Sequence, residues 1–119
     1  MAFLHFAKQE TDLNVIEVGM GGRLDATSLC KGNISLITSI DKDHTSYLGN
    51  TIQEIAFEKA SIIKSGGMVF AVNENKDVVN TISKIAKNKS AKLHLLGNQF
   101  GICFSTHLSL RKIIEDPST

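Results

Sequence analysis

The chain has 119 residues, which is enough for one domain with a real core and too few for two. Its 13 Lys and Arg nearly balance its 12 Asp and Glu, and the formal net charge of +1 argues against a nucleic-acid binder that relies on a basic face. At 42% hydrophobic residues the composition is that of a globular protein, and the longest apolar runs are far too short to span a membrane.

The two cysteines, Cys30 and Cys103, lie far apart and match no metal or redox spacing. The N-terminus also lacks the charged start and apolar core of a signal peptide. We therefore expect reduced thiols in a cytoplasmic protein, with neither secretion nor membrane insertion.

Short apolar runs alternate with amphipathic stretches along the chain. Residues 2–9 suggest the last turns of a helix, and helical spacing of apolar residues predicts two further helices, over 51–64 and 76–90. The segment SGG at 65–67 is a plausible stop for the first of these two. Nearly continuous apolar runs predict strands buried on both faces, over 13–18, 34–40, 68–72, 92–96 and 100–105. This alternation predicts an α/β domain with a parallel sheet flanked by helices.

The predicted helix over 51–64 carries one residue that does not fit its face. Lys59 falls on the apolar stripe formed by Ile52, Ile55, Ala56 and Ile63. A lysine in such a stripe must extend its amine to water, find a partner, lose its proton or be chemically converted.

A glycine-rich loop, EVGMGGRLDAT, follows the first predicted strand. Glu17 lies near the end of that predicted strand and Asp25 lies farther out in the loop. The glycines permit tight turns and close approach of a ligand. Leu24 stands where a third fingerprint glycine would be, so the loop is not a dinucleotide fingerprint. A plain turn between a strand and a loop is the alternative interpretation.

A second polar loop, SIDKDHTSYLG, follows the next predicted strand. It places Asp41, Asp43 and His44 just past a buried strand, where ligands bind in open parallel sheets. A neutral histidine suits a divalent metal, although a hydrogen-bonded loop residue is the alternative. We interpret the remaining histidines as structural or exposed: His5, His94 and His107.

The combination of Glu17, His44 and Lys59 is more informative than its parts. If the two predicted strands are neighbours, Glu17 and His44 leave the same sheet edge, and Lys59 lies on the inward face of the helix that follows. A lysine amine that reacts with carbon dioxide becomes a carbamate, which is an anion and a metal ligand. The alternative is an ordinary lysine paired with Glu58 or with a phosphate.

Three segments together resemble a known family. EVGMGGRLDATS, ITSIDKDHTSYLGNTIQEIAFEKASIIK and SGGMVF are similar, in order and spacing, to the central ATP-dependent domain of folylpolyglutamate synthase and dihydrofolate synthase. These enzymes belong to the Mur ligase superfamily, whose central domain is P-loop NTPase-like. The resemblance implies a partial central domain over 1–105 and leaves 106–119 as an unassigned tail.

The resemblance also implies site residues and a reaction. Glu17 and His44 would be ligands of a catalytic Mg²⁺, Lys59 the carbamylated lysine near the ATP γ-phosphate, and Leu24, Asp25 and Ala26 the segment that contacts the pterin. ATP would phosphorylate a carboxylate of dihydropteroate or of a folate glutamate tail, and the amine of L-glutamate would then attack the acyl phosphate. Folate or dihydropteroate, L-glutamate and ATP are the implied small-molecule partners.

The sequence departs from the family pattern at several positions and lacks some of the family's segments. Ser28 replaces an asparagine, Asp41 and Lys42 replace a glycine–hydrophobic pair, and Ser61 replaces a glycine. The family's P-loop and C-terminal glutamate-binding domain do not occur in these 119 residues. We therefore expect a ligase fragment that is inactive alone. It would either assemble with a separately encoded remainder or be a non-catalytic α/β binding or interaction module.

Overall fold

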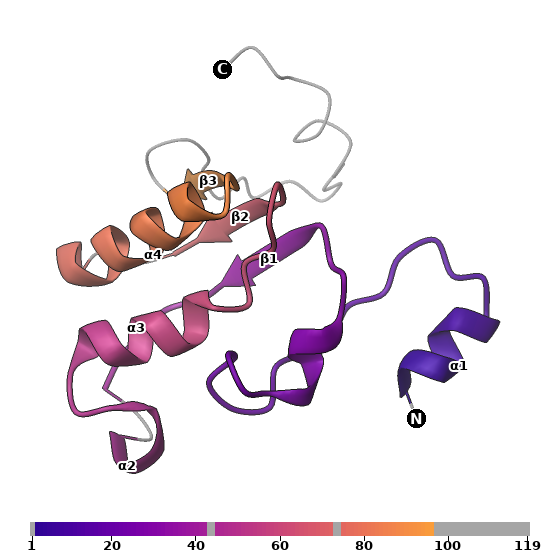
Figure 1. Cartoon of the computed structure of the whole chain (residues 1–119), viewed down its shortest axis with the longest axis horizontal. Helices are drawn as coiled ribbons and strands as arrows, with labels where there is room; N and C mark the ends of the chain where they lie inside the picture. The colour runs from indigo at the N-terminus through magenta and orange to yellow at the C-terminus, as the bar shows by residue number, and fades with distance from the viewer. Residues whose placement is uncertain (1, 43–44, 73–74, 97–119) are drawn as a thin grey trace, which may run out of the picture.

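The computed structural model describes residues 2–42, 45–72 and 75–96 (Figure 1). Three short strands and four α-helices alternate along most of this length, together with one 3₁₀ helix. In chain order the elements are α1 (Ala2–Lys8), η1 (Ala26–Leu29), β1 (Ile34–Ile37), α2 (Thr45–Leu48), α3 (Ile52–Ala60), β2 (Met68–Ala71), α4 (Lys76–Asn88) and β3 (Lys92–Leu95).

The three strands form one parallel sheet in the order β1-β2-β3. Ile34 is in register with Met68, and Met68 with Lys92, so the strands begin at the same level. Helix α3 connects β1 to β2 and α4 connects β2 to β3. The expected α/β architecture is confirmed.

Local sequence explains where the two long helices begin. Thr51 and Glu54 form a reciprocal capping box at the start of α3, in which each side chain accepts a hydrogen bond from the other residue's backbone. The Asn75 side chain caps the start of α4 by accepting a hydrogen bond from the Asp77 amide. Helix α3 ends at Ala60, with Ser61 as its cap, and therefore stops before the expected glycine signal at 65–67.

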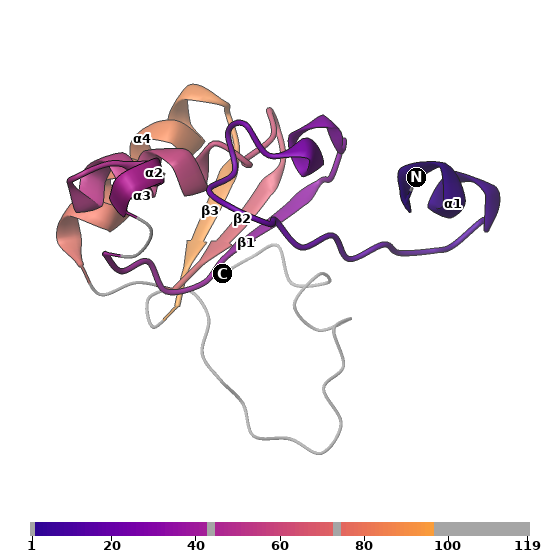
Figure 2. The ribbon, with the colours of Figure 1, turned by 90° about the horizontal axis from the view of Figure 1, so that it is seen from below.

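The core lies between the sheet and the pair α3–α4, which cover one face of the sheet (Figure 2). The largest side chains with essentially no exposure are Ile55, Ile63, Ile82, Val69 and Val78. In β1, Ser35 and Ile37 face this core, while Ile34 and Leu36 are 47% and 66% exposed. The expectation that this strand is buried on both faces is therefore wrong, because the described helices pack against only one of them.

The strand predicted at 13–18 does not form. No strand is assigned there, Leu13 and Val15 are 73% and 82% exposed, and no backbone hydrogen bond links this segment to β1. A strand is stabilised by its neighbours, and the described part of the chain provides this segment with neither a paired strand nor a covering layer.

Two other expectations concern parts of the chain that lie outside the described residues: the strand at 100–105 and the tail at 106–119. The N-terminal helix is confirmed as α1. None of the described helices is long and apolar enough to cross a membrane.

Candidate functional site

The glycine-rich loop is organised around the Asp25 carboxylate. Its Oδ1 accepts hydrogen bonds from the Thr27 amide at 2.8 Å and the Thr27 hydroxyl at 2.6 Å, and its Oδ2 accepts from the Gly19 and Met20 amides, both at 3.2 Å. The bonds from Thr27, with those from Met20 and Gly19, lower the pKa of Asp25 from its ordinary value. Asp25 thus folds its own loop and caps η1.

Two glycines of this loop lie close against the helices. A Cβ on Gly21, whose φ is +68°, would come within 2.8 Å of Leu48 in α2. A Cβ on Gly22, whose φ is +155°, would come within 2.8 Å of the Glu58 carbonyl oxygen and 2.7 Å of the Ile62 side chain. Only glycine permits this contact between the loop and α3.

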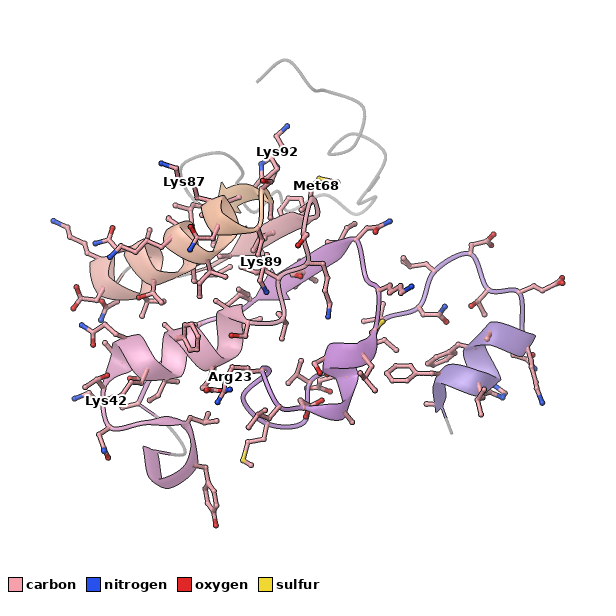
Figure 3. The ribbon with its side chains drawn as sticks, in the orientation of Figure 1. Arg23, Lys42, Met68, Lys87, Lys89 and Lys92 are labelled. Atoms are coloured by element: carbon pink, nitrogen blue, oxygen red, sulfur yellow. The ribbon has the colours of Figure 1, made fainter. Side chains whose placement is uncertain are left out.

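Arg23 fastens the loop to α3. Its Nε donates to Glu58 Oε1 at 2.8 Å, and its backbone amide donates to the Glu58 carbonyl oxygen at 3.2 Å. In Figure 3 the Arg23 side chain lies beside α3. Sequence reasoning did not predict this pair, because 35 residues separate its members and neither carries a local signal of the other.

Lys59 follows Glu58 on α3 and is half-buried, as is Ile52, while Ile55, Ala56 and Ile63 of its stripe are buried. Among the described residues the Lys59 side-chain amine has no hydrogen-bond or ion-pair partner. Glu58 binds Arg23, so the suggested pairing of Lys59 with Glu58 is not formed. The amine is therefore not committed to a carboxylate within the described part of the chain.

The role of the two predicted metal ligands stays a prediction. Glu17 is exposed and lies in the segment to which no strand is assigned. His44 and Asp43 lie outside the described residues. Within the described ranges no three His, Cys, Asp or Glu residues gather closely enough to hold a metal ion.

Two lysines donate to backbone carbonyl groups near the C-terminal end of α3, on the residues that follow the helix and on η1. Lys89 Nζ donates to the Ser61 carbonyl at 2.9 Å and also to that of Ile63, and Lys64 Nζ donates to the Ser28 carbonyl at 2.6 Å. Burial, and then the charge of Lys64, lower the pKa of Lys89. These contacts satisfy the helix end and join it to η1, which is a structural role.

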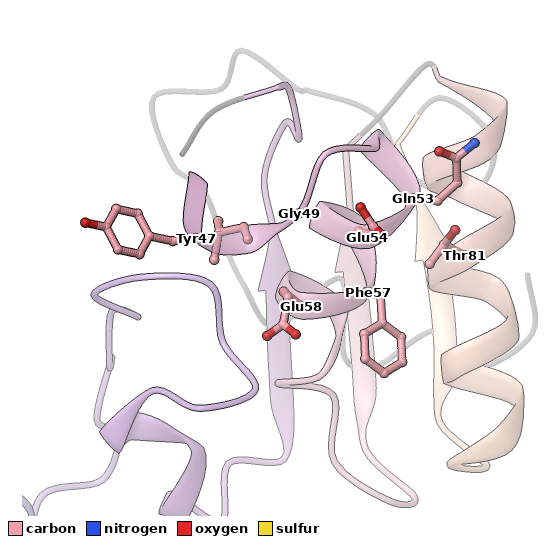
Figure 4. A pocket seen from close by; sticks show the side chains of 8 residues that line it. Tyr47, Gly49, Gln53, Glu54, Phe57, Glu58 and Thr81 are labelled. Carbon is pink, nitrogen blue, oxygen red and sulfur yellow. The ribbon is translucent and has the colours of Figure 1, made fainter. Parts of the chain in front are cut away.

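An open groove crosses the helical side of the molecule between α2, α3 and α4 (Figure 4). Its lining residues are Tyr47, Leu48, Gly49, Gln53, Glu54, Phe57, Glu58 and Thr81. Glu54 is already bonded within the capping box and Glu58 to Arg23, so both carboxylates of the groove have protein partners.

Comparison with known proteins identifies the relatives of this arrangement. Residues 1–111 match the family model described as the Mur ligase middle domain. A dihydrofolate synthase/folylpolyglutamate synthase of Bacillus subtilis is 40% identical over 96 residues, which cover 80% of this chain and 22% of that protein.

Solved structures agree with the sequence comparison. A Mycobacterium tuberculosis folylpolyglutamate synthase complexed with ADP and AMPPCP superposes with a TM-score of 0.78 at 33% identity, over 86% of this chain and 24% of that one. A structure described as an FPGS-AMPPCP-folate complex gives 0.81 at 32% identity, over 84% and 24%. The chain thus spans about a quarter of the length of these relatives.

Proposed function

The chain belongs to the Mur ligase middle-domain family, and on this premise we propose that it is part of an ATP-dependent folate ligase. The reaction is the addition of L-glutamate to dihydropteroate or to a folate polyglutamate tail through an acyl phosphate. The observation that carries the proposal is the agreement of sequence and fold with folate ligases over more than four-fifths of the chain.

We assign the Mg²⁺ ligands to Glu17 and His44, and propose that a carbamate on Lys59 supplies a second anionic group beside the Glu17 carboxylate. Oxygen ligands suit a hard cation, and the exposed Glu17 carboxylate and a carbamate on Lys59 would both supply them, since the Lys59 amine has no side-chain partner among the described residues. When bound, Mg²⁺ supplies charge neutralisation and orientation for the transferring phosphoryl group. Addition of carbon dioxide to the neutral amine of Lys59 forms the carbamate and releases one proton.

Pterin contact is assigned to Leu24, Asp25 and Ala26. Leu24 is 81% exposed and Ala26 is exposed, so both are available to a flat ring. Asp25 has both carboxylate oxygens bonded within the loop and presents its neighbours in a fixed conformation. A preorganised loop of this kind orders less on binding than a mobile one would.

The nucleotide phosphates require groups that these 119 residues do not contain, because no Gly-Lys-Ser or Gly-Lys-Thr loop occurs in them. We propose that the rest of a ligase, in the same or a separate polypeptide, supplies that loop. The 119 residues alone are then expected not to catalyse the ligase reaction. Ile34 and Leu36 are exposed on the sheet face that none of the described helices covers, which is consistent with further contacts there.

A chimera tests the proposal. Residues 1–104 replace the matched segment of the B. subtilis relative, and ADP release is measured with Mg²⁺, L-glutamate and dihydropteroate or folate. We expect turnover by the chimera and none by the 119-residue chain. A folded but inactive chimera, or substrate-dependent ADP release by the chain alone, would contradict the proposal.

A further inference from the structure

The attachment of the glycine-rich loop to α3 converges on a single helical residue. The Glu58 carboxylate accepts a hydrogen bond from the Arg23 side chain, and the Glu58 carbonyl oxygen accepts one from the Arg23 amide. A Cβ added to Gly22 would lie 2.8 Å from the same carbonyl oxygen. The Glu58 side chain is only 18% exposed, whereas that of Arg23 is 49% exposed. A carboxylate that is largely removed from water depends on this guanidinium as its partner.

Each member of this ion pair directly precedes a residue to which a function is assigned. Leu24, the first residue assigned to the pterin, follows Arg23 directly, and Lys59, the residue assigned to carbamylation, follows Glu58 directly. One ion pair therefore joins the residue before the substrate segment to the residue before the reactive lysine. No other ion pair is present in the described part of the chain.

We infer that Arg23 and Glu58 are positioning residues that hold the substrate loop at a fixed place beside Lys59, an inference that rests on the proposed function. Their side chains bind each other, and the role inferred for them is to position the loop, with no part in the chemistry itself. The bond from Arg23 Nε to Glu58 fixes the distance between loop and helix, and the two glycines allow that distance to be short. Asp25 keeps the loop in one conformation. Breaking the pair loosens the loop from α3 and leaves the backbone bond to Glu58 and the loop's internal bonds in place.

Amide hydrogen exchange on the full chain measures the attachment itself. Arg23→Ala and Glu58→Ala should each accelerate exchange at the backbone amide of residue 23 by about three- to tenfold. This is the range expected for loss of a partly buried charged pair. Exchange in β2 and α4 should not change. The doubly reversed variant, Arg23→Glu with Glu58→Arg, should restore slow exchange, and Lys84→Ala on the exposed side of α4 is the matched charge control.

Pteroate is the probe for the functional half of the inference. Its affinity is measured from chemical-shift changes at the loop amides, and it should fall by a similar factor in both alanine variants and recover in the reversed pair. Unchanged exchange in the single variants, or no recovery in the reversed pair, overturns the positioning role. A different outcome bears on the proposed function instead. If exchange changes as expected but pteroate causes no shifts in the unsubstituted chain, the assignment of this loop to the substrate is wrong.

Discussion

Replacing Gly22 by alanine probes the contact on which the candidate site depends. The new Cβ would lie 2.7 Å from the Ile62 Cγ2 atom, 2.8 Å from the Glu58 carbonyl oxygen and 3.2 Å from that of Lys59. Both oxygens belong to the backbone around the end of α3 and cannot move aside like a flexible side chain. Together with the positive φ at this position, this predicts a loss of about 2–4 kcal/mol of unfolding free energy.

The loss has an upper bound, because the loop can lift from α3 instead of straining the helix. Urea unfolding therefore needs a second readout, which is the exchange rate of the Arg23 amide that donates to Glu58. Gly32→Ala is the control, since its Cβ would meet nothing closer than 3.8 Å and its change should stay within about 1 kcal/mol. Equal stabilities of the two variants, with the Arg23 amide still protected in Gly22→Ala, would refute the close seating of the loop.

Three further outcomes test the packing, the capping and the pH dependence. Ile55→Ala should lower the unfolding free energy by about 3–4 kcal/mol, whereas Phe57→Ala, a larger residue on the same helix but 49% exposed, should change it by less than about 1 kcal/mol. Thr51→Ala should lower it by about 1 kcal/mol because the Glu54 amide loses its acceptor, and Thr51→Ser should not. Burial, and then Lys92, lower the pKa of His94 below 6.5, so its stabilising contribution is complete above pH 6.5 and is lost as the pH falls through the lowered pKa. His94→Gln should remove this acid-side slope measured by urea titration at each pH, whereas a variant of the exposed His5 should keep it; an unchanged slope in His94→Gln would contradict the assignment.

Local patterns predicted the elements that depend on local information. The helical spacing around Ile55 and Ile82 lies within the helices that it predicts, α3 and α4. The failed strand at 13–18 had an equally apolar pattern, but a strand also requires neighbours, which its own sequence does not specify.

The candidate site was predicted in the same uneven way. The stripe that carries Lys59 follows from helical spacing, and its half-burial agrees with that spacing. The role of Asp25 within its own loop was detectable, because an aspartate two residues before a threonine amide is a common turn and cap. The Arg23–Glu58 pair was not, since nothing in either local sequence indicates a partner 35 residues away.

The most direct test of the account is the chemical state of Lys59 in the chimeric ligase. Carbon-13 NMR of a sample supplied with labelled bicarbonate and Mg²⁺ should show one carbamate carbonyl resonance that is absent from Lys59→Arg. The Lys59→Ala chimera should lose ADP release and recover part of it with an added small carboxylate. An active chimera without the resonance, or a fully active Lys59→Ala variant, would contradict the assignment of Lys59 and leave it an ordinary half-buried lysine.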